Sequence, residues 1–118
     1  MALKVGVITV VRNAEKTIQD TLNSVANQSY PYKQHLIWDG LSTDQTMAIV
    51  ERFAQKMPHV SWVSQGDDGM YDALNQAIKK MDADVIAILH ADDYYASSEV
   101  LSIIMETFTQ NQNLDGVY

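Results

Sequence analysis

Residues 85–93, Val-Ile-Ala-Ile-Leu-His-Ala-Asp-Asp, decide the fold more than any other stretch of the chain. The apolar run from Val85 to Leu89 predicts a strand that is buried on both faces, and it stops abruptly at His90. Two adjacent carboxylates, Asp92 and Asp93, follow almost at once. A buried strand that runs straight into paired carboxylates is typical of the ligand-binding edge of a parallel α/β sheet.

The chain on both sides of this junction alternates between strand and helix patterns. Short apolar runs rich in β-branched residues predict further strands at residues 4–11, 35–38 and 60–64. Apolar residues at helical spacing predict helices over residues 14–27, after a capping box at Ser42 and Gln45, around residues 71–81, and after Ser97 or Ser98. Residues 116–118 resemble the opening of another strand.

Strict alternation of strands and helices requires right-handed crossovers and a parallel sheet. We therefore expect one α/β domain over residues 1–118, with a mostly parallel sheet flanked by helices. Pro58 should end the helix that follows the capping box. The side chains expected on the buried helix faces are Ile18, Leu22, Val25, Ile49, Val50, Phe53, Met57, Tyr71, Leu74, Ile78, Met81, Leu101, Ile104, Met105 and Phe108.

Composition narrows the classes of function. The chain has no cysteine, so any metal must be bound by oxygen or imidazole. Fifteen acidic and eight basic residues give a formal charge of −7, which argues against a nucleic-acid partner. With so few cationic side chains, a phosphorylated ligand would need a divalent cation beside it. No apolar stretch is long enough to cross a bilayer and no signal peptide is visible, so we expect a soluble, cytoplasmic chain.

Polar residues follow each predicted strand. In an open parallel sheet the carboxyl ends of the strands share one edge, and ligands bind there. The four loops at that edge contain Arg12-Asn13, Asp39-Gly40, Gln65 to Gly69, and His90 to Asp93. Because each loop supplies polar groups and three supply carboxylates, the sequence predicts a binding site at this edge.

Asp92 and Asp93 are the strongest candidates within it. Adjacent carboxylates directly after a buried strand suit Mg²⁺ or Mn²⁺, with a diphosphate completing the coordination shell. The alternative is that one of them only caps the following helix. His90 is either a metal ligand or a hydrogen-bonded structural residue.

The other loop residues are less specific. Asp39 could accept a hydrogen bond from a nucleobase or ribose, or it could stabilise its own turn. Asp67 stands between glycine and aspartate residues in what could equally be a solvated turn. Arg12 and Asn13 could contact phosphate or cap the next helix. Trp38 and Tyr71 are expected in the core or in a pocket wall.

Taken together, these loops resemble the family 2 glycosyltransferases, in particular their bacterial branch. Five segments in the order of that family carry the resemblance: Ile8 to Asn13 (ITVVRN), Ser24 to Tyr30 (SVANQSY), Trp38 to Thr46 (WDGLSTDQT), Ser64 to Asn75 (SQGDDGMYDALN) and His90 to Asp93 (HADD). The last occupies the place of the family's D-x-D metal motif. The match covers essentially the whole chain, but only the first half of the family's catalytic domain.

The resemblance implies the Rossmann-like nucleotide-binding half of a GT-A fold, which binds a nucleotide diphosphate sugar. By matching position, Thr9 and Arg12 would lie beside the nucleotide and Asp39 would contact the base, typically uracil. Asp67 would contribute to the nucleotide pocket. Asp92, helped by Asp93, would hold Mn²⁺ or Mg²⁺ against the diphosphate, where the metal stabilises the leaving group.

Three departures from the family pattern stand out. His90 replaces the first Asn or Asp of the metal motif. Gln65 stands where glutamate is common, and Gln76-Ala77 stands where Lys-Gly is frequent. The base that deprotonates the acceptor comes from the second half of the family's domain, so it is expected beyond Tyr118 and no catalytic residue can be assigned here.

The leading hypothesis is that the complete enzyme transfers a sugar, with inversion, from a UDP-linked donor to a saccharide or lipid-linked acceptor, acting in the cytoplasm or at the inner face of a membrane. The acceptor half is expected to be absent from this chain, so transfer by the chain itself should be negligible. Two rivals are a non-catalytic nucleotide-binding module that self-assembles through an open sheet edge, and a metal-dependent phosphoryl-transfer domain. The second rival lacks a phosphate-cradling loop.

Overall fold

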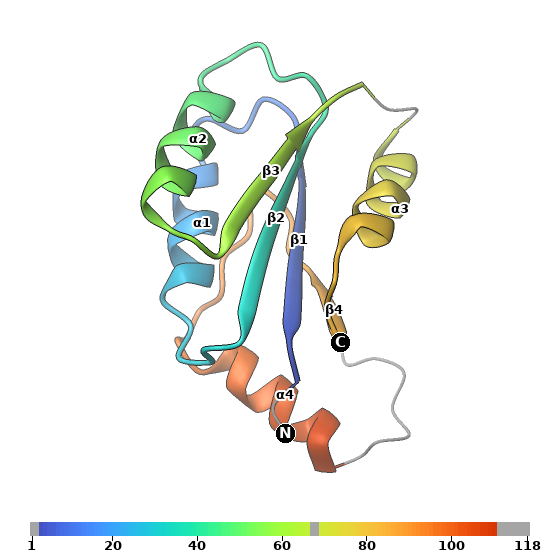
Figure 1. The fold of residues 1–118 in the computed structure, drawn as a ribbon. Helices are drawn as coiled ribbons and strands as arrows, with labels where there is room; N and C mark the ends of the chain where they lie inside the picture. Colours follow the sequence, from blue (N-terminus) through green and yellow to red (C-terminus); the bar gives the residue numbers. More distant parts are fainter. Residues whose placement is uncertain (1–2, 67–68, 111–118) are drawn as a thin grey trace.

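The fold is a four-stranded parallel sheet with helices on both faces (Figure 1). The computed structural model describes residues 3–66 and 69–110 of the 118. Its strands are β1 (Val5–Val11), β2 (Lys33–Asp39), β3 (Val60–Ser64) and β4 (Val85–Ile88). Its helices are α1 (Ile18–Ala26), α2 (Thr46–Lys56), α3 (Met70–Lys80) and α4 (Val100–Gln110). The predicted alternation and the parallel sheet are confirmed.

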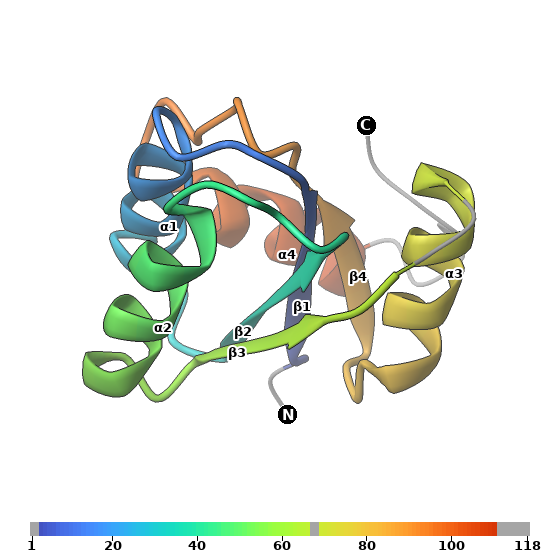
Figure 2. The same cartoon turned by 90° about the horizontal axis from the view of Figure 1, so that it is seen from above.

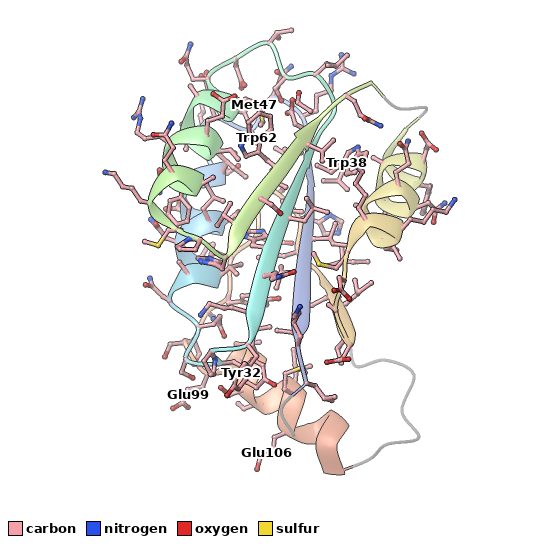
Figure 3. The ribbon with its side chains drawn as sticks, in the orientation of Figure 1. Tyr32, Trp38, Met47, Trp62, Glu99 and Glu106 are labelled. Atoms are coloured by element: carbon pink, nitrogen blue, oxygen red, sulfur yellow. The ribbon has the colours of Figure 1, made fainter. Side chains whose placement is uncertain are left out.

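The helices form two layers around the sheet (Figure 2). α1, α2 and α4 cover one face, where Ile18, Leu22 and Val25 of α1 are fully buried. α3 alone covers the other face, where Ala73 and Ala77 pack on a cluster that includes Trp38. Trp38 lies between the sheet and α3, as predicted for a core residue (Figure 3).

The strand order β3-β2-β1-β4 places a reversal of direction between β1 and β4. From β1 the chain steps outward to β2 and then to β3, and it then returns by way of α3 on the opposite face to pair β4 with the other side of β1. The loops after β1 and β4 lead to α1 and α4 on the same face and lie next to each other at the carboxyl edge of the sheet. In open α/β sheets a ligand crevice opens at this kind of reversal, beyond the carboxyl ends of the two strands.

Two expected helix starts were wrong. α1 begins at Ile18 instead of residue 14, because residues 14–17 form a turn in which the Ala14 N–H donates to Thr46 and the Glu15 N–H donates to Asp44. The capping box at Ser42 and Gln45 does not form, since the Ser42 hydroxyl donates to Asp39 instead. Asp44 replaces it by accepting hydrogen bonds from the N–H and hydroxyl of Thr46.

Two expected burial patterns were also wrong. α3 packs through its alanines, so Tyr71 is 84% exposed and belongs to neither core nor pocket wall, and Ile78 is 38% exposed. The strand after residue 84 ends at Ile88 and alternates, with Ile88 half exposed. Among the described strands β4 is the last in the sheet, a position that a continuous apolar run does not reveal. Met57 ends α2 and is partly exposed, whereas Val50, Leu101 and Met105 are buried as expected.

The predicted strand at residues 116–118 lies outside the described residues. Ser97 accepts a hydrogen bond from the Glu99 N–H in the turn before α4, whereas the first helical bond runs from the Ile103 N–H to the Glu99 carbonyl, so Ser97 supports that turn and does not cap the helix as expected. None of the helices that the structure describes is long and apolar enough to span a membrane.

A buried polar pair lies beneath the sheet on the α1 face. The Thr9 hydroxyl and His35 Nε2 are 2.8 Å apart, and both residues are fully buried. His35 Nδ1 has no hydrogen-bond partner among the described residues. Burial, with the charge of His59 adding to it, lowers the pKa of His35 to about 3. The folded protein therefore keeps this imidazole neutral where an unfolded chain would protonate it.

This depressed pKa predicts a loss of stability in mild acid. Below an unfolded-state pKa of about 6.5 the unfolded chain takes up a proton that the folded chain refuses, so the free energy of unfolding should fall by about 2 kcal/mol from pH 7 to pH 5. Above about pH 6.5 the imidazole is neutral in both states, so it no longer makes the free energy of unfolding depend on pH. Urea unfolding across this range should show the loss in the native chain and not in His35→Gln. His59→Gln, which changes a half-buried ring, should keep most of the slope. Parallel profiles for the native chain and His35→Gln would contradict the assignment.

Candidate functional site

A hollow of about 630 Å³ lies at the carboxyl ends of β1 and β4, where the strand order reverses. Its volume is in the range of small-molecule sites, about 300–1,000 Å³. Its walls come mainly from the loop after β1 and from the loop after β4. The polar residues that line it are Arg12, Asn13, Glu15, Lys16, Thr17, Asp44, His90 and Asp92.

The charges of the hollow come from three loops and have both signs. Arg12, Lys16 and Glu15 lie on the loop after β1, Asp44 on the loop after β2, and Asp92 on the loop after β4. Arg12 and Asp92 are both exposed. Within the described residues, no hydrogen bond or ion pair holds the Arg12 guanidinium. A guanidinium and a carboxylate that line the same hollow can meet an anion together with the cation that the anion carries.

Hydrogen bonds join the loop after β1 to the loop after β2. The Asn13 side chain accepts a bond from the Thr43 N–H at 2.8 Å, and the Asn13 N–H donates to the Ser42 hydroxyl at 2.8 Å. The Ala14 N–H donates to the Thr46 hydroxyl at 2.8 Å. The wall that carries Arg12 is therefore held from the neighbouring loop, and Asn13 acts in that contact rather than as a helix cap.

Asp39 anchors the joined loops from below. It is fully buried at the end of β2, and its carboxylate accepts hydrogen bonds from the Ser42 N–H, the Ser42 hydroxyl and the Ser64 hydroxyl. The turn that it holds places Leu41 at φ 62°, a conformation that disfavours a branched side chain. Asp39 thus stabilises its own turn in this structure, and its predicted contact with a base stays a prediction.

Two threonines of the first helix region hold the backbone around Asp92. The Thr17 hydroxyl donates to the Ala91 carbonyl at 2.9 Å. The Thr21 hydroxyl lies within hydrogen-bond distance of the Ala91 and Asp93 carbonyls. Because the carbonyls on both sides of Asp92 are bound, the position of its Cα is fixed while its carboxylate stays exposed at the hollow.

The remaining predicted residues lie in different places. His90 lines the hollow beside Asp92, whereas Asp93 is exposed and does not line it. Thr9 is buried against His35, below the hollow, and its hydroxyl is not part of the lining. Asp67 lies outside the described residues.

Two of the departures from the family pattern meet in space. The Gln65 Nε2 donates to the Gln76 Oε1 at 2.7 Å, and the Gln76 amide in turn donates to Asp72 at 2.9 Å. Two uncharged amides therefore join the loop after β3 to α3 where the family pattern would place a glutamate and a lysine. The two positions therefore still contact each other through a hydrogen bond, now between neutral groups.

Sequence reasoning missed the threonines that hold the metal-motif loop. Thr17 and Thr21 are four residues apart, so they lie on one face of the chain that enters α1. Hydroxyls at that spacing on an otherwise apolar face were a visible signal. Their carbonyl partners are about 70 residues further along the chain, so the pairing itself could not be read from the sequence.

The sequence model of Glycosyl transferase family 2 matches residues 6–117. The chain belongs to this family. One relative is the poly(ribitol-phosphate) beta-N-acetylglucosaminyltransferase TarS of Staphylococcus aureus. It is 34% identical over 78% of this chain and 17% of TarS. The putative teichuronic acid biosynthesis glycosyltransferase TuaG of Bacillus subtilis is 32% identical over 86% of the chain and 42% of TuaG.

Solved structures agree with the family assignment. A mannosyltransferase from Pyrobaculum calidifontis, in complex with GDP-Man and Mn²⁺, superposes with a TM-score of 0.85 at 25% identity, over 92% of this chain and 33% of that one. TarS in complex with UDP-GlcNAc superposes with a TM-score of 0.85 at 27% identity, over 98% of this chain and 37% of the TarS chain. The fold of the family 2 chain is therefore that of the GT-A glycosyltransferases, and the chain spans less than half the length of these relatives.

Proposed function

We propose that this chain is the donor-binding part of a family 2 glycosyltransferase that transfers a sugar, with inversion, from a UDP-linked donor to a saccharide or lipid-linked acceptor. The observation that carries the proposal is the hollow at the reversal between β1 and β4, which both Arg12 and Asp92 line. Relatives bound to UDP-GlcNAc and to GDP-Man support a nucleotide-sugar donor.

Each wall has a role in this proposal. Arg12 contacts the diphosphate, since a guanidinium binds phosphate oxygens through paired N–H donors. Asp39 acts on the base side by holding the loop of Gly40 and Asp44, both of which line the hollow. Thr9 supports that side from beneath through His35. Asp67 is assigned to the nucleotide pocket from the family pattern.

The donor set suits Mn²⁺ or Mg²⁺, which prefer oxygen ligands. Asp92 would hold the ion, with Asp93 next to it in sequence. Within residues 3–66 and 69–110, no three His, Cys, Asp or Glu side chains come together as a ready-made metal site. Diphosphate oxygens and water would therefore complete the shell, as is common for Mg²⁺ bound by one or two carboxylates. The bound ion would neutralise charge on the leaving diphosphate, which the acidic chain could not do by itself.

Inversion needs a general base that deprotonates the acceptor hydroxyl. That base is assigned to the region beyond Tyr118, in the part of the family's domain that binds the acceptor. Donor binding and transfer are therefore separable properties, and the first can be measured on this chain.

Isothermal titration of UDP into the chain tests the donor proposal. With Mn²⁺ present, UDP should bind with a Kd on the order of 100 μM. Chelator should weaken binding at least about tenfold, because the diphosphate then faces Asp92 without a cation between them. ATP serves as the matched control and should bind more weakly than UDP. Equal affinity for ATP and UDP would favour a phosphoryl-transfer domain. If UDP does not bind in the presence of Mn²⁺, the proposed donor site is wrong.

A further inference from the structure

A second hollow, of about 540 Å³, lies between the outer side of α1 and residues 94–98. It shares no lining residue with the first hollow. Along the chain, Ala91 and Asp92 line the first hollow and Tyr94 and Tyr95 line the second, and Thr21 binds the carbonyls of Ala91 and Asp93 at this junction. Its volume is again that of a small-molecule site, about 300–1,000 Å³.

Every residue that lines this hollow carries a polar group, and two of them also carry an aromatic ring. It presents the carboxylate of Asp20, the amides of Asn23 and Asn27, and the phenols of Tyr94 and Tyr95. Among the residues that line it in the described structure there is no lysine, arginine or histidine. A phosphate group would meet a carboxylate and no cation here, so the chemistry excludes a nucleotide and favours an uncharged ligand that both donates and accepts hydrogen bonds.

Three polar residues lie along one side of α1 and its C-cap. They are Asp20, Asn23 and Asn27, spaced at three and four residues. Asp20 in the first turn and Asn27 at the C-cap occupy positions that suit a helix. Asn23 lies inside α1, where asparagine is a weaker helix former than lysine, glutamate or arginine. Its amide oxygen accepts a hydrogen bond from Gln19, which leaves the NH₂ group to donate to a ligand.

The hollow is held open by contacts beneath it. The Gln28 amide donates to the Ser97 carbonyl at 2.7 Å and accepts from the Leu101 N–H at 2.9 Å. The Ser29 N–H donates to the Ser98 carbonyl at 2.7 Å. These bonds fix the end of α1 to the segment before α4, so a ligand would meet a site that already has its shape.

The two tyrosines differ in burial and complete the site. Tyr94 is 64% exposed, so its ring stands at the opening. Tyr95 is partly buried and packs against the core cluster of Val7 and Leu101. Burial raises the pKa of Tyr95 to about 12, so its hydroxyl stays a neutral hydrogen-bond donor at any physiological pH. An exposed aromatic face beside amides and a carboxylate matches a sugar ring, which offers C–H groups on one face and hydroxyls at its edge.

We propose that the hollow between α1 and residues 94–98 is a second binding site of this chain, and that its ligand is an uncharged saccharide. The site goes beyond the proposed function, because binding there requires neither donor nor metal. Its position directly after the segment that carries Asp92 would let it hold a sugar unit of a chain that extends past the donor hollow.

Amide chemical shifts of the ¹⁵N-labelled chain test the proposal, with cellotetraose and chitotetraose as probes. At least one probe should shift the signals of residues 20–28 and 94–98 with a Kd on the order of 1 mM. UDP with Mn²⁺ should leave that affinity unchanged. Tetragalacturonate, which has a similar size and carries carboxylates, should bind at least about tenfold more weakly because of Asp20.

Two variants complete the test. Tyr94→Ala and Asn23→Ala should each weaken saccharide binding about tenfold. Asn23→Ala is the informative one, because alanine favours the helix and the thermal midpoint should stay or rise. Arg12→Ala, on the other hollow, should leave saccharide binding intact. The proposal is overturned if neither probe shifts these residues at about 20 mM, if only residues of the donor hollow shift, or if both variants bind like the native chain.

Discussion

Asp92→Ala should remove the Mn²⁺-dependent part of UDP binding, weakening the Kd about 100-fold, whereas Asp93→Ala should change it less than about threefold. The two carboxylates are neighbours in sequence and both are exposed, but only Asp92 lines the hollow between β1 and β4. Loss of Asp92 would leave the diphosphate in an acidic site without the carboxylate that holds its cation.

Titrations with Mn²⁺ and with chelator measure this difference directly. In Asp92→Ala the two titrations should coincide, because the remaining binding no longer depends on the metal. Asp93→Ala is the matched control, since it removes the same charge one residue away. Equal losses in the two variants would show that the pair acts together, and a larger loss in Asp93→Ala would reverse the assignment.

Asp39→Ala should lower the free energy of unfolding by about 3 kcal/mol. The substitution leaves the Ser42 N–H, the Ser42 hydroxyl and the Ser64 hydroxyl without their acceptor at a fully buried position. A buried donor left without a partner costs about 1–3 kcal/mol, but Ser42 is partly buried and Ser64 is exposed, so water restores part of this loss. The turn at Leu41, with its positive φ, would also lose its main support.

Urea unfolding at neutral pH measures the loss. Asp39→Asn should cost less than Asp39→Ala, because one carboxamide oxygen still accepts while the NH₂ group replaces the second acceptor. Asp82→Ala removes an exposed carboxylate after α3 and should change stability by less than about 0.5 kcal/mol. A cost for Asp39→Ala as small as that of the control would mean that water replaces the lost acceptor.

The edge at which the site lies could be predicted from sequence, because the carboxyl ends of parallel strands must share one side of the sheet. The details above it could not. Ser42 has the right spacing for a capping box, but a buried Asp39 competes for its hydroxyl from outside the helix. Tyr71 has the right spacing for a buried face, but Ala73 allows α3 to approach the sheet along another stripe. In both cases a contact outside the helix overrides the preference that the local sequence pattern indicates.

The presence of two separate hollows, one proposed for the donor and one for a saccharide, also could not be predicted from the local sequence. The motif Asp92-Asp93 marks one of them, while the other arises from α1 and residues 94–98, which nothing in the local pattern joins. Thr17 and Thr21 connect the two parts of the chain across about 70 residues. Only the folded chain brings these hydroxyls to the carbonyls that they hold.

Because Gln65 and Gln76 are hydrogen-bonded to each other, these two positions should be exchanged together when parts of related enzymes are combined. A loop after β3 taken from a relative with glutamate at position 65 would bring a second carboxylate near Asp72. The Gln76 amide would then be shared between two carboxylates. Bringing α3 from the same relative would restore a matched partner. Chimeras of this family should therefore be cut outside residues 65–76, so that both partners always come from the same parent.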